Sequence, residues 1–347
     1  MPRSPLKVVV LPDAGPENPF QYELVRYLRE QGLTVHVGKK YTLGSTFRAI
    51  VRYRPDVIYY DWVHSFILGR SLVWSWVKSL IFILEIIVTR FLYRTKIVHT
   101  LHNLQNHAGI LLGLERVVYR FFLQNCFLIR VYSEETKEAA IELFRLKPDR
   151  IKVIQDLPYH LYYENKIDRI TARKKLNLPS ESFVYLFFGE IKPYKGVDNL
   201  LKAFAEAAQS EDYLVIAGKS DDEVYFSSLA ALAEAIPNVS MYHRFIENEE
   251  VQLFFNAADV VVLPFVRIDH SGSVDLAMSF RKPVISLKTE AMRRLLNHQA
   301  ALLFETPEQL SRCLKKAKEV DKEAVGQQNF RIADSTDYRD ILQLFVR

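Results

Sequence analysis

The chain has few cysteines and no glycine-rich loop, and both shortages exclude kinds of protein. Its two cysteines, Cys126 and Cys313, stand far apart in a chain of 347 residues. Without a Cys-x-x-Cys pair or a Cys/His cluster we expect no zinc site, and two thiols alone favour a reducing compartment. The first apolar run leads into a loop at residues 13–18 with a single glycine, which is not the Gly-x-Gly-x-x-Gly of a dinucleotide cofactor site. An NAD-dependent oxidoreductase is therefore disfavoured.

Other signatures are missing as well. No P-loop, Ser-His-Asp signature or metal-ligand cluster stands out, so we expect no metal and no other bound cofactor. The net charge of +5, from 46 basic and 41 acidic residues, is far short of a nucleic-acid-binding arm, and no nucleic-acid partner is expected. That mild excess suits phosphates or an anionic membrane surface. The apolar run near the N-terminus is too short for a secretory signal, so the expected location is the cytoplasm.

What the sequence does contain is an alternation of short apolar runs and amphipathic stretches, which is typical of parallel sheets in α/β proteins. The clearest helix pattern covers residues 20–31 and ends at Gly32. In the first half, strands are expected at residues 7–11, 34–37, 57–60, 96–101, 127–132 and 152–154. In the second half they are expected at residues 183–188, 213–217, 239–243, 260–264, 283–286 and 301–304.

These elements predict an α/β protein with two Rossmann-like domains, over residues 1–168 and 169–334. The boundary is placed in a polar stretch, and an amphipathic helix at 335–347 is expected to pack back on the first domain. Ligands of open α/β sheets bind outside the carboxyl ends of the strands. Two such edges facing a shared interdomain cleft would suit a reaction between two bulky substrates.

One segment, residues 71–94, does not fit a soluble sheet. Its polar members Ser71, Ser75, Lys78, Ser79, Glu85 and Thr89 share one narrow helical stripe, and the rest of the circumference is apolar. Lys78 and Glu85 interrupt the roughly 18 uncharged residues that a membrane-crossing helix needs. Two interpretations stay open, a helix lying in a membrane interface with Trp74 and Trp76 as anchors, and a helix sandwiched between the sheet and its neighbours.

Two loops in the second half could hold an anionic ligand. The first follows the strand at 183–188 and carries Lys192 and Lys195 just before Gly196 opens a helix, where two lysines can neutralise a departing diphosphate. The second contains Ser271, Gly272 and Ser273 before another helix, where small residues let backbone N–H groups approach an anion. The alternatives are solvated loop lysines and an ordinary serine helix cap.

In the first half, two polar residues directly follow expected strands. His102 follows the strand at 96–101, where a neutral imidazole can accept a proton or hold a sugar hydroxyl. Asp61 follows the strand at 57–60 and is the alternative base. Either residue could instead be an ordinary hydrogen-bonded loop side chain.

The second half resembles the family-4 glycosyltransferases of the GT-B fold. The resemblance rests on GEIKPYKG at 189–196, AGK at 217–219, RFIENEEVQLFFNAADVVVLPF at 244–265 and SGSVDLAMSFRKPVI at 271–285. In the first half, NPFQYELVRYLREQG at 18–32, DW at 61–62 and HTLHNLQNH at 99–107 resemble a branch used in exopolysaccharide assembly.

The resemblance implies roles for individual residues. It implies that Lys192 and Lys195 contact the donor diphosphate, with Ser271, Gly272 and Ser273 opposite them. It also implies that Phe245 and Ile246 lie against the nucleotide base, that His102 faces the transferred sugar, and that Gly15 belongs to a flexible loop beside the phosphates.

The sequence departs from the family pattern at several positions. Glu190 stands where many relatives have arginine, Ile268 and Leu276 stand where a pair of glutamates is usual, and Arg281 replaces a glycine. Asp269 and Asp275 are acidic residues nearby that could replace the glutamates.

The resulting hypothesis is a metal-independent glycosyltransferase that moves a sugar from a UDP- or GDP-sugar to a lipid-linked or polysaccharide-precursor acceptor. It would act at the inner face of the plasma membrane, and closure of the domains would exclude water. The rivals are a non-catalytic nucleotide-sugar-binding or scaffold subunit of a polysaccharide-synthesis complex, and a sugar-nucleotide epimerase of the same fold.

Overall fold

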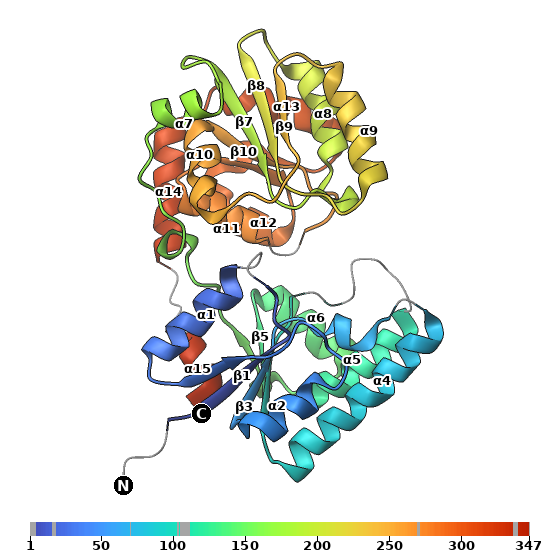
Figure 1. The fold of residues 1–347 in the computed structure, drawn as a ribbon. Coiled ribbons are helices and arrows are strands. Elements are labelled where there is room, and N and C mark those ends of the chain that lie inside the picture. Colours follow the sequence, from blue (N-terminus) through green and yellow to red (C-terminus); the bar gives the residue numbers. More distant parts are fainter. Residues whose placement is uncertain are drawn as a thin grey trace. The chain divides into compact units, whose positions relative to one another are not determined.

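The computed structural model describes residues 5–15, 19–69, 71–102, 104, 112–268, 271–335 and 339–346. Contacts divide the chain into two compact units, Met1–Leu157 with Asp337–Arg347, and Pro158–Thr336. Figure 1 shows each unit as a sheet covered by helices. Both units are α/β, as the alternation of apolar runs predicts.

The first unit is built on a parallel six-stranded sheet with the order β2-β1-β3-β4-β5-β6. Its strands are β1 Lys7–Leu11, β2 Thr34–Val37, β3 Val57–Tyr60, β4 Lys96–Thr100, β5 Leu128–Val131 and β6 Ile151–Val153. Its α-helices are α1 Pro19–Glu30, α2 Ser45–Tyr53, α3 His64–Ile67, α4 Leu72–Ile87, α5 Leu112–Asn125, α6 Glu134–Phe144 and α15 Asp340–Val346.

Alternate side chains of each strand in this sheet enter different cores, because successive residues of a strand point to opposite faces. Val8 and Val10 pack with α1 and α15, whereas Val9 and Leu11 pack with α2 to α6. The sheet is thus buried on both faces, which is why its strands are continuous apolar runs in the sequence.

The second unit repeats the plan with the strand order β12-β11-β10-β7-β8-β9, again parallel throughout. Its strands are β7 Phe183–Phe188, β8 Asp212–Ala217, β9 Val239–Tyr242, β10 Val260–Leu263, β11 Val284–Leu287 and β12 Leu303–Phe304. Its α-helices are α7 Arg169–Lys175, α8 Val197–Ala207, α9 Glu223–Glu234, α10 Asn248–Ala257, α11 Gly272–Ser279, α12 Glu290–Leu295, α13 Leu310–Ala317 and α14 Lys322–Asp334. One core contains residues of α7, α10 and α11, and the opposite core contains residues of α8, α9 and α13.

All twelve expected strands are present, most of them within one or two residues of the expected ends. The helix expected at 20–31 is α1, and Gly32 follows it with φ 84°.

The division between the units falls earlier than the expected boundary at residue 168. Tyr159, Tyr163 and Ile167 pack against the core of the second unit, so residues 158–168 belong there. The expected boundary rested on the polar residues that follow Tyr163, and the composition does not show which unit the apolar side chains among residues 158–168 pack against. The C-terminal helix is shorter than the expected range 335–347, and its residues Ile341 and Phe345 are buried in the first unit.

The segment at 71–94 forms α4 followed by a π-helical turn at Val88–Leu92. By length and composition alone, Leu72–Leu92 could cross a membrane, with a mean hydropathy of 1.8 and 33% of its most apolar window buried. The structure buries Ser75, Ser79, Glu85 and Thr89 of the polar stripe and leaves much of the apolar surface of this helix exposed. A helix enclosed on all sides, one of the two interpretations of the sequence, is therefore wrong.

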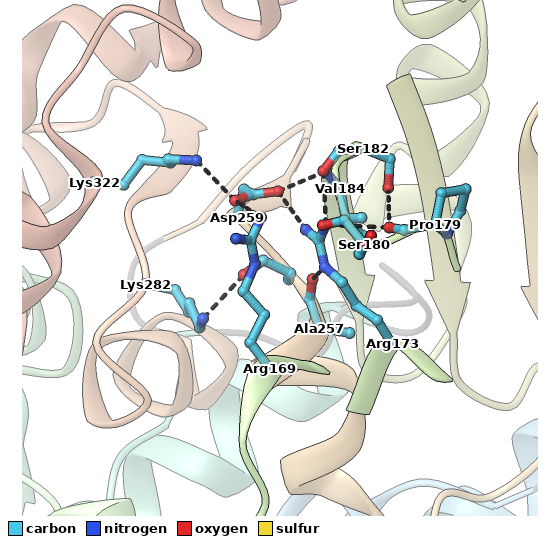
Figure 2. Close-up of polar contacts among 11 residues, drawn as sticks. Arg169, Arg173, Pro179, Ser180, Ser182, Val184, Ala257, Asp259, Lys282 and Lys322 are labelled. Carbon is cyan, nitrogen blue, oxygen red and sulfur yellow. Dashed lines mark hydrogen bonds and ion pairs between the residues drawn. The ribbon is translucent and has the colours of Figure 1, made fainter. Parts of the chain in front are cut away.

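A buried ionic network ties the amino-terminal side of the second sheet together (Figure 2). Asp259, just before β10, accepts hydrogen bonds from Arg173 at 2.7 Å, Lys322 at 2.8 Å and the backbone N–H of Val184 at 2.8 Å. Arg173 is 1% exposed and also donates to four backbone oxygens, among them those of Ala257 and Ser182. The network links α7, β7, β10 and α14, and it lies at the strand ends opposite to the loops with Lys195 and Ser273.

Candidate nucleotide-sugar site

The loop with the two lysines leaves the carboxyl end of β7 at Gly189. Gly189 has φ 131°, and Gly196, the N-cap of α8, has φ 68°. A Cβ atom at Gly196 would lie 2.1 Å from the carbonyl oxygen of Pro264, so only glycine lets this loop pack against the end of β10. Because β7 and β10 are neighbours in the sheet, the lysine loop and the serine loop leave the same edge.

Lys195 lies in the loop at this sheet edge, beside two aromatic rings. Its ammonium is 5.0 Å from the centre of the Phe265 ring and 5.8 Å from that of Tyr194. Burial lowers the pKa of Lys195 to about 8, although the nearby carboxylate of Glu190 favours its charged form. A cation held among aromatic rings is poorly hydrated, so an incoming anion would gain from neutralising it.

The serine loop reaches the same point from the end of β10. Ser271 is the N-cap of α11 and accepts a hydrogen bond from the backbone N–H of Ser273 at 3.2 Å, so the capping interpretation is confirmed for this residue. Gly272 is the first residue of α11. A Cβ atom at Gly189 would lie 3.1 Å from the Ser273 hydroxyl and 3.9 Å from the Lys195 ammonium, so both groups converge on Gly189.

Phe245 and Ile246 lie between β9 and α10. Ile246 is buried in the core of the second unit, so only its backbone can face a base, while Phe245 is half-buried. Gly15 is in the first unit, where it has φ 79° and donates its N–H to the Asp13 carboxylate at 2.9 Å.

The departures from the family pattern have structural consequences. Glu190 forms an ion pair with Lys192 at 2.7 Å, so Lys192 carries a partner of its own in this structure. Ile268 and Leu276 are buried in the apolar core, where carboxylates would be costly. Arg281 has φ 55°, a conformation that glycine adopts more easily, and its guanidinium lies 3.8 Å from the centre of the Phe330 ring. Asp269 lies outside the described residues, and Asp275 is in the first turn of α11.

In the first unit, His102 and Asp61 form a single hydrogen-bonded pair. The His102 Nε2 atom is 2.7 Å from Asp61 Oδ1, and the Asp61 side chain is fully buried. The sequence treated the two residues as alternative bases, but they follow the neighbouring strands β3 and β4 and meet at one sheet edge.

Three further residues fix this pair, and the sequence analysis missed them. Trp62 stacks on the His102 ring with centroids 4.7 Å apart, and the Tyr132 hydroxyl is 3.1 Å from Nδ1. Gln21 donates to Asp61 at 3.3 Å. Both ring nitrogens of His102 therefore have protein partners. Tyr132 ends an expected strand, so the same strand-end argument could have found it.

Across the residues that the structure describes, no group of three or more His, Cys, Asp or Glu side chains is placed to hold a metal ion. The cations near Gly189 and the amides of α11 are the groups that this edge offers to an anion.

Comparison with known proteins finds relatives across this region. Residues 168–328 match the family described as glycosyl transferases group 1. An uncharacterized glycosyltransferase of Methanocaldococcus jannaschii is 25% identical over 203 residues, covering 56% of this chain and 50% of that protein. A GDP-mannose:glycolipid 4-beta-D-mannosyltransferase of Xanthomonas campestris is 26% identical over 121 residues, covering 35% of this chain and 34% of that protein. The chain thus matches about half or less of the length of these curated relatives.

Among solved structures, HepE of Anabaena, in complex with UDP and glucose, superposes with a TM-score of 0.73 at 18% identity. The superposition covers 97% of both chains, so the likeness of fold extends over both units. The chain therefore has the GT-B fold, and its residues 168–328 are similar to the glycosyl transferases group 1 family.

Proposed function

We propose that this protein is a glycosyltransferase that moves a sugar from a UDP- or GDP-sugar to a lipid-linked or polysaccharide-precursor acceptor, without a metal, at the cytoplasmic face of a membrane. One observation carries the proposal. Lys195 and Ser273 converge on Gly189, where two loops leave neighbouring strands and α11 begins. The match of residues 168–328 to the glycosyl transferases group 1 family supports the same chemistry.

The proposed chemistry at this edge is stabilisation of a leaving diphosphate. Negative charge grows on the diphosphate as its bond to the sugar breaks, and the Lys195 ammonium and the N-terminus of α11 supply positive potential that needs no rearrangement. Lys192 can contribute once the diphosphate competes with Glu190 for its ammonium. Ser271, the N-cap, and Gly272 and Ser273, the first residues of α11, supply N–H and hydroxyl donors.

The choice between donor bases stays open in this proposal. HepE is described with UDP, whereas the Xanthomonas relative is named for GDP-mannose. We place the base against the backbone at Phe245 and Ile246. The name of the Xanthomonas relative includes a glycolipid, which supports an acceptor with a lipid.

We assign His102 to the sugar or the acceptor hydroxyl, together with Asp61. In the unliganded arrangement Asp61 accepts from Nε2–H, and Nδ1 can accept from the Tyr132 hydroxyl. A substrate hydroxyl would reach Nδ1 by replacing Tyr132, whose contact at 3.1 Å is the longer of the two. Asp61 would then hold the ring and stabilise its charged form as a proton arrives.

The donor site is tested by a thermal-shift screen with UDP, GDP, ADP and their common sugar conjugates, followed by the variant Lys195→Ala. A ligand that binds only the folded protein raises the melting temperature. We expect one nucleotide family to stabilise the wild type and Lys195→Ala to lose both that shift and turnover. Turnover is measured as nucleotide release from the conjugate in the presence of a membrane lipid extract.

The matched control is Lys202→Ala, which removes an exposed lysine from α8 that pairs only loosely with Asp198 at 3.7 Å. This variant should keep the ligand-induced shift. Near-normal turnover by Lys195→Ala would overturn the assignment of the diphosphate site.

A non-catalytic binding subunit is the second candidate, and the Glu190–Lys192 ion pair and the buried Ile268 and Leu276 favour it. It predicts that a nucleotide diphosphate raises the melting temperature while no conjugate is turned over with any lipid extract. Turnover with one conjugate would eliminate this candidate.

A further inference from the structure

On the face of the first unit formed by α4, the exposed side chains are mostly apolar, which is the reverse of an ordinary surface helix. Val73, Trp76, Leu80, Leu84, Ile87 and Phe91 recur every three or four residues and are all exposed; we call them the apolar stripe. Ten of the 21 exposed large apolar side chains among the described residues lie between Leu72 and Tyr93. A surface helix of a soluble protein normally buries its apolar side, and a large exposed apolar patch marks an interaction site.

The polar side of the same helix is fixed inside the first unit. Ser75 Oγ accepts from the backbone N–H of Gly69 at 2.9 Å, and Ser79 Oγ donates to the carbonyl of Ile67 at 3.3 Å. The Glu85 carboxylate accepts from the N–H of Phe47 at 2.9 Å, and burial raises the pKa of Glu85 to about 7. A helix that crossed a bilayer would lose these partners and expose Glu85 to hydrocarbon, so α4 is built to lie against a surface.

The neighbouring helix α2 extends this face and adds charge. Phe47 and Val51 are exposed one turn apart on α2, which meets α4 through the bond between Phe47 and Glu85. The exposed arginines Arg48 and Arg52 lie on the same helix, and Arg94 follows the π-helical turn. Within residues 45–54 and 71–94 the single acidic residue is the buried Glu85.

We propose that the apolar stripe and α2 bind the surface of a bilayer that contains anionic phospholipid, with α4 lying parallel to the membrane. Exposed aromatic and aliphatic side chains would enter the interface, while Arg48, Arg52 and Arg94 meet lipid phosphates. A second copy of the chain fits this face less well, because an isologous pair would bring the same arginines together without carboxylates to balance them. Figure 1 shows α4 along the outside of the first unit, beside α5.

This inference rests on the proposed function, because it concerns where the proposed reaction takes place. Its test measures lipid binding rather than sugar transfer, so the membrane proposal and the glycosyltransferase proposal can fail independently. The purified chain is floated on a density gradient with phosphatidylcholine vesicles that do or do not contain phosphatidylglycerol. The test variant is Leu80→Gln with Leu84→Gln. The matched control is Ile170→Gln with Val224→Gln, two apolar residues of the second unit that are at least as exposed as Leu80 and Leu84.

We expect the wild type and the control to float with the anionic vesicles, and the stripe variant to bind about tenfold more weakly at an unchanged melting temperature. Arg48→Gln with Arg52→Gln should weaken binding and reduce its dependence on salt.

Three results would overturn the proposal. They are a wild type that binds neither vesicle, a stripe variant that floats like the wild type, and a stripe variant that unfolds. Light scattering that shows a dimer in the wild type and a monomer in the stripe variant would assign the face to a second copy instead.

Discussion

Lys195 combines a positive charge with a position that water reaches poorly, among the rings of Tyr194 and Phe265. Burial is the main reason for the lowered pKa of its ammonium, about 8. The unliganded protein therefore carries this charge below pH 8 and loses it as the pH rises through that value. A diphosphate binds the charged form and should raise this pKa again.

The affinity of the wild type for UDP or GDP should accordingly fall above pH 8, and the fall should approach about tenfold per pH unit. Calorimetric titrations between pH 7.5 and 9.5 measure this, a range in which the phosphates themselves are already ionised. Lys195→Arg should flatten the profile, because a guanidinium stays charged throughout. A wild-type affinity that is flat over this range would argue against a role of Lys195 in diphosphate binding.

The pair of His102 and Asp61 marks a limit of residue-scale prediction. The end of an apolar strand is visible in the sequence, so both positions could be found. Their hydrogen bond, the stacking of Trp62 and the contact with Tyr132 depend on which strands become neighbours and on the side-chain rotamers. Apolar periodicity does not contain that information.

At the scale of the element, two helices end on a residue with a strained backbone conformation, which the sequence does not predict. Arg145 follows α6 with φ 53°, in the left-handed region where a side chain is unfavourable, and its side chain is exposed. Arg54 ends α2 in the same way, with φ 45°.

Arg145→Gly should stabilise the first unit by about 0.5–1 kcal/mol, because glycine adopts this conformation without a clash of its Cβ atom. Thermal and urea unfolding measure the change. Arg145→Ala is the control and should give no such gain, since alanine keeps the Cβ atom. A glycine variant that is no more stable than the alanine variant would contradict this account.

At the scale of the whole molecule, the network around Asp259 holds together parts of the second unit that are far apart in the chain. Asp259 joins α7 through Arg173, β7 through Val184 and α14 through Lys322. Burial would raise the pKa of Asp259, but the bonds from Lys322 and Val184 outweigh it and hold the pKa below its usual range. The carboxylate therefore stays ionised and balances the buried Arg173.

Asp259→Asn should destabilise the protein by roughly 3–5 kcal/mol, because it leaves the guanidinium of Arg173 buried without a counter-charge. The melting temperature of the second unit measures this loss. Glu290→Gln is the control, since Glu290 pairs with Arg293 and Arg294 on the surface and such pairs contribute at most about 1 kcal/mol. Equal melting temperatures for the two variants would show that the network does not stabilise the second unit.

The sequence by itself determined the two parallel sheets, since runs of apolar residues of strand length alternate with amphipathic helices in both halves. It also placed Lys195 and Ser273 at strand ends, because chain order and strand length fix where each loop leaves its sheet. It also predicted the polar stripe of α4, because the spacing of polar residues along a helix shows by itself which of them share a side.

Only the tertiary structure decided which side of α4 faces inward, since the partners of that stripe come from two other segments, Phe47 from α2 and Ile67 and Gly69 from the end of α3 and the loop after it. The same holds for the pairing of Glu190 with Lys192, for the aromatic contacts that draw residues 158–168 into the second unit, and for the convergence of Lys195 and Ser273 on Gly189. Each of these depends on contacts between side chains, or between a side chain and distant backbone, that form once the sheets have assembled. Local periodicity fixes the elements, and packing between distant segments fixes what their side chains touch.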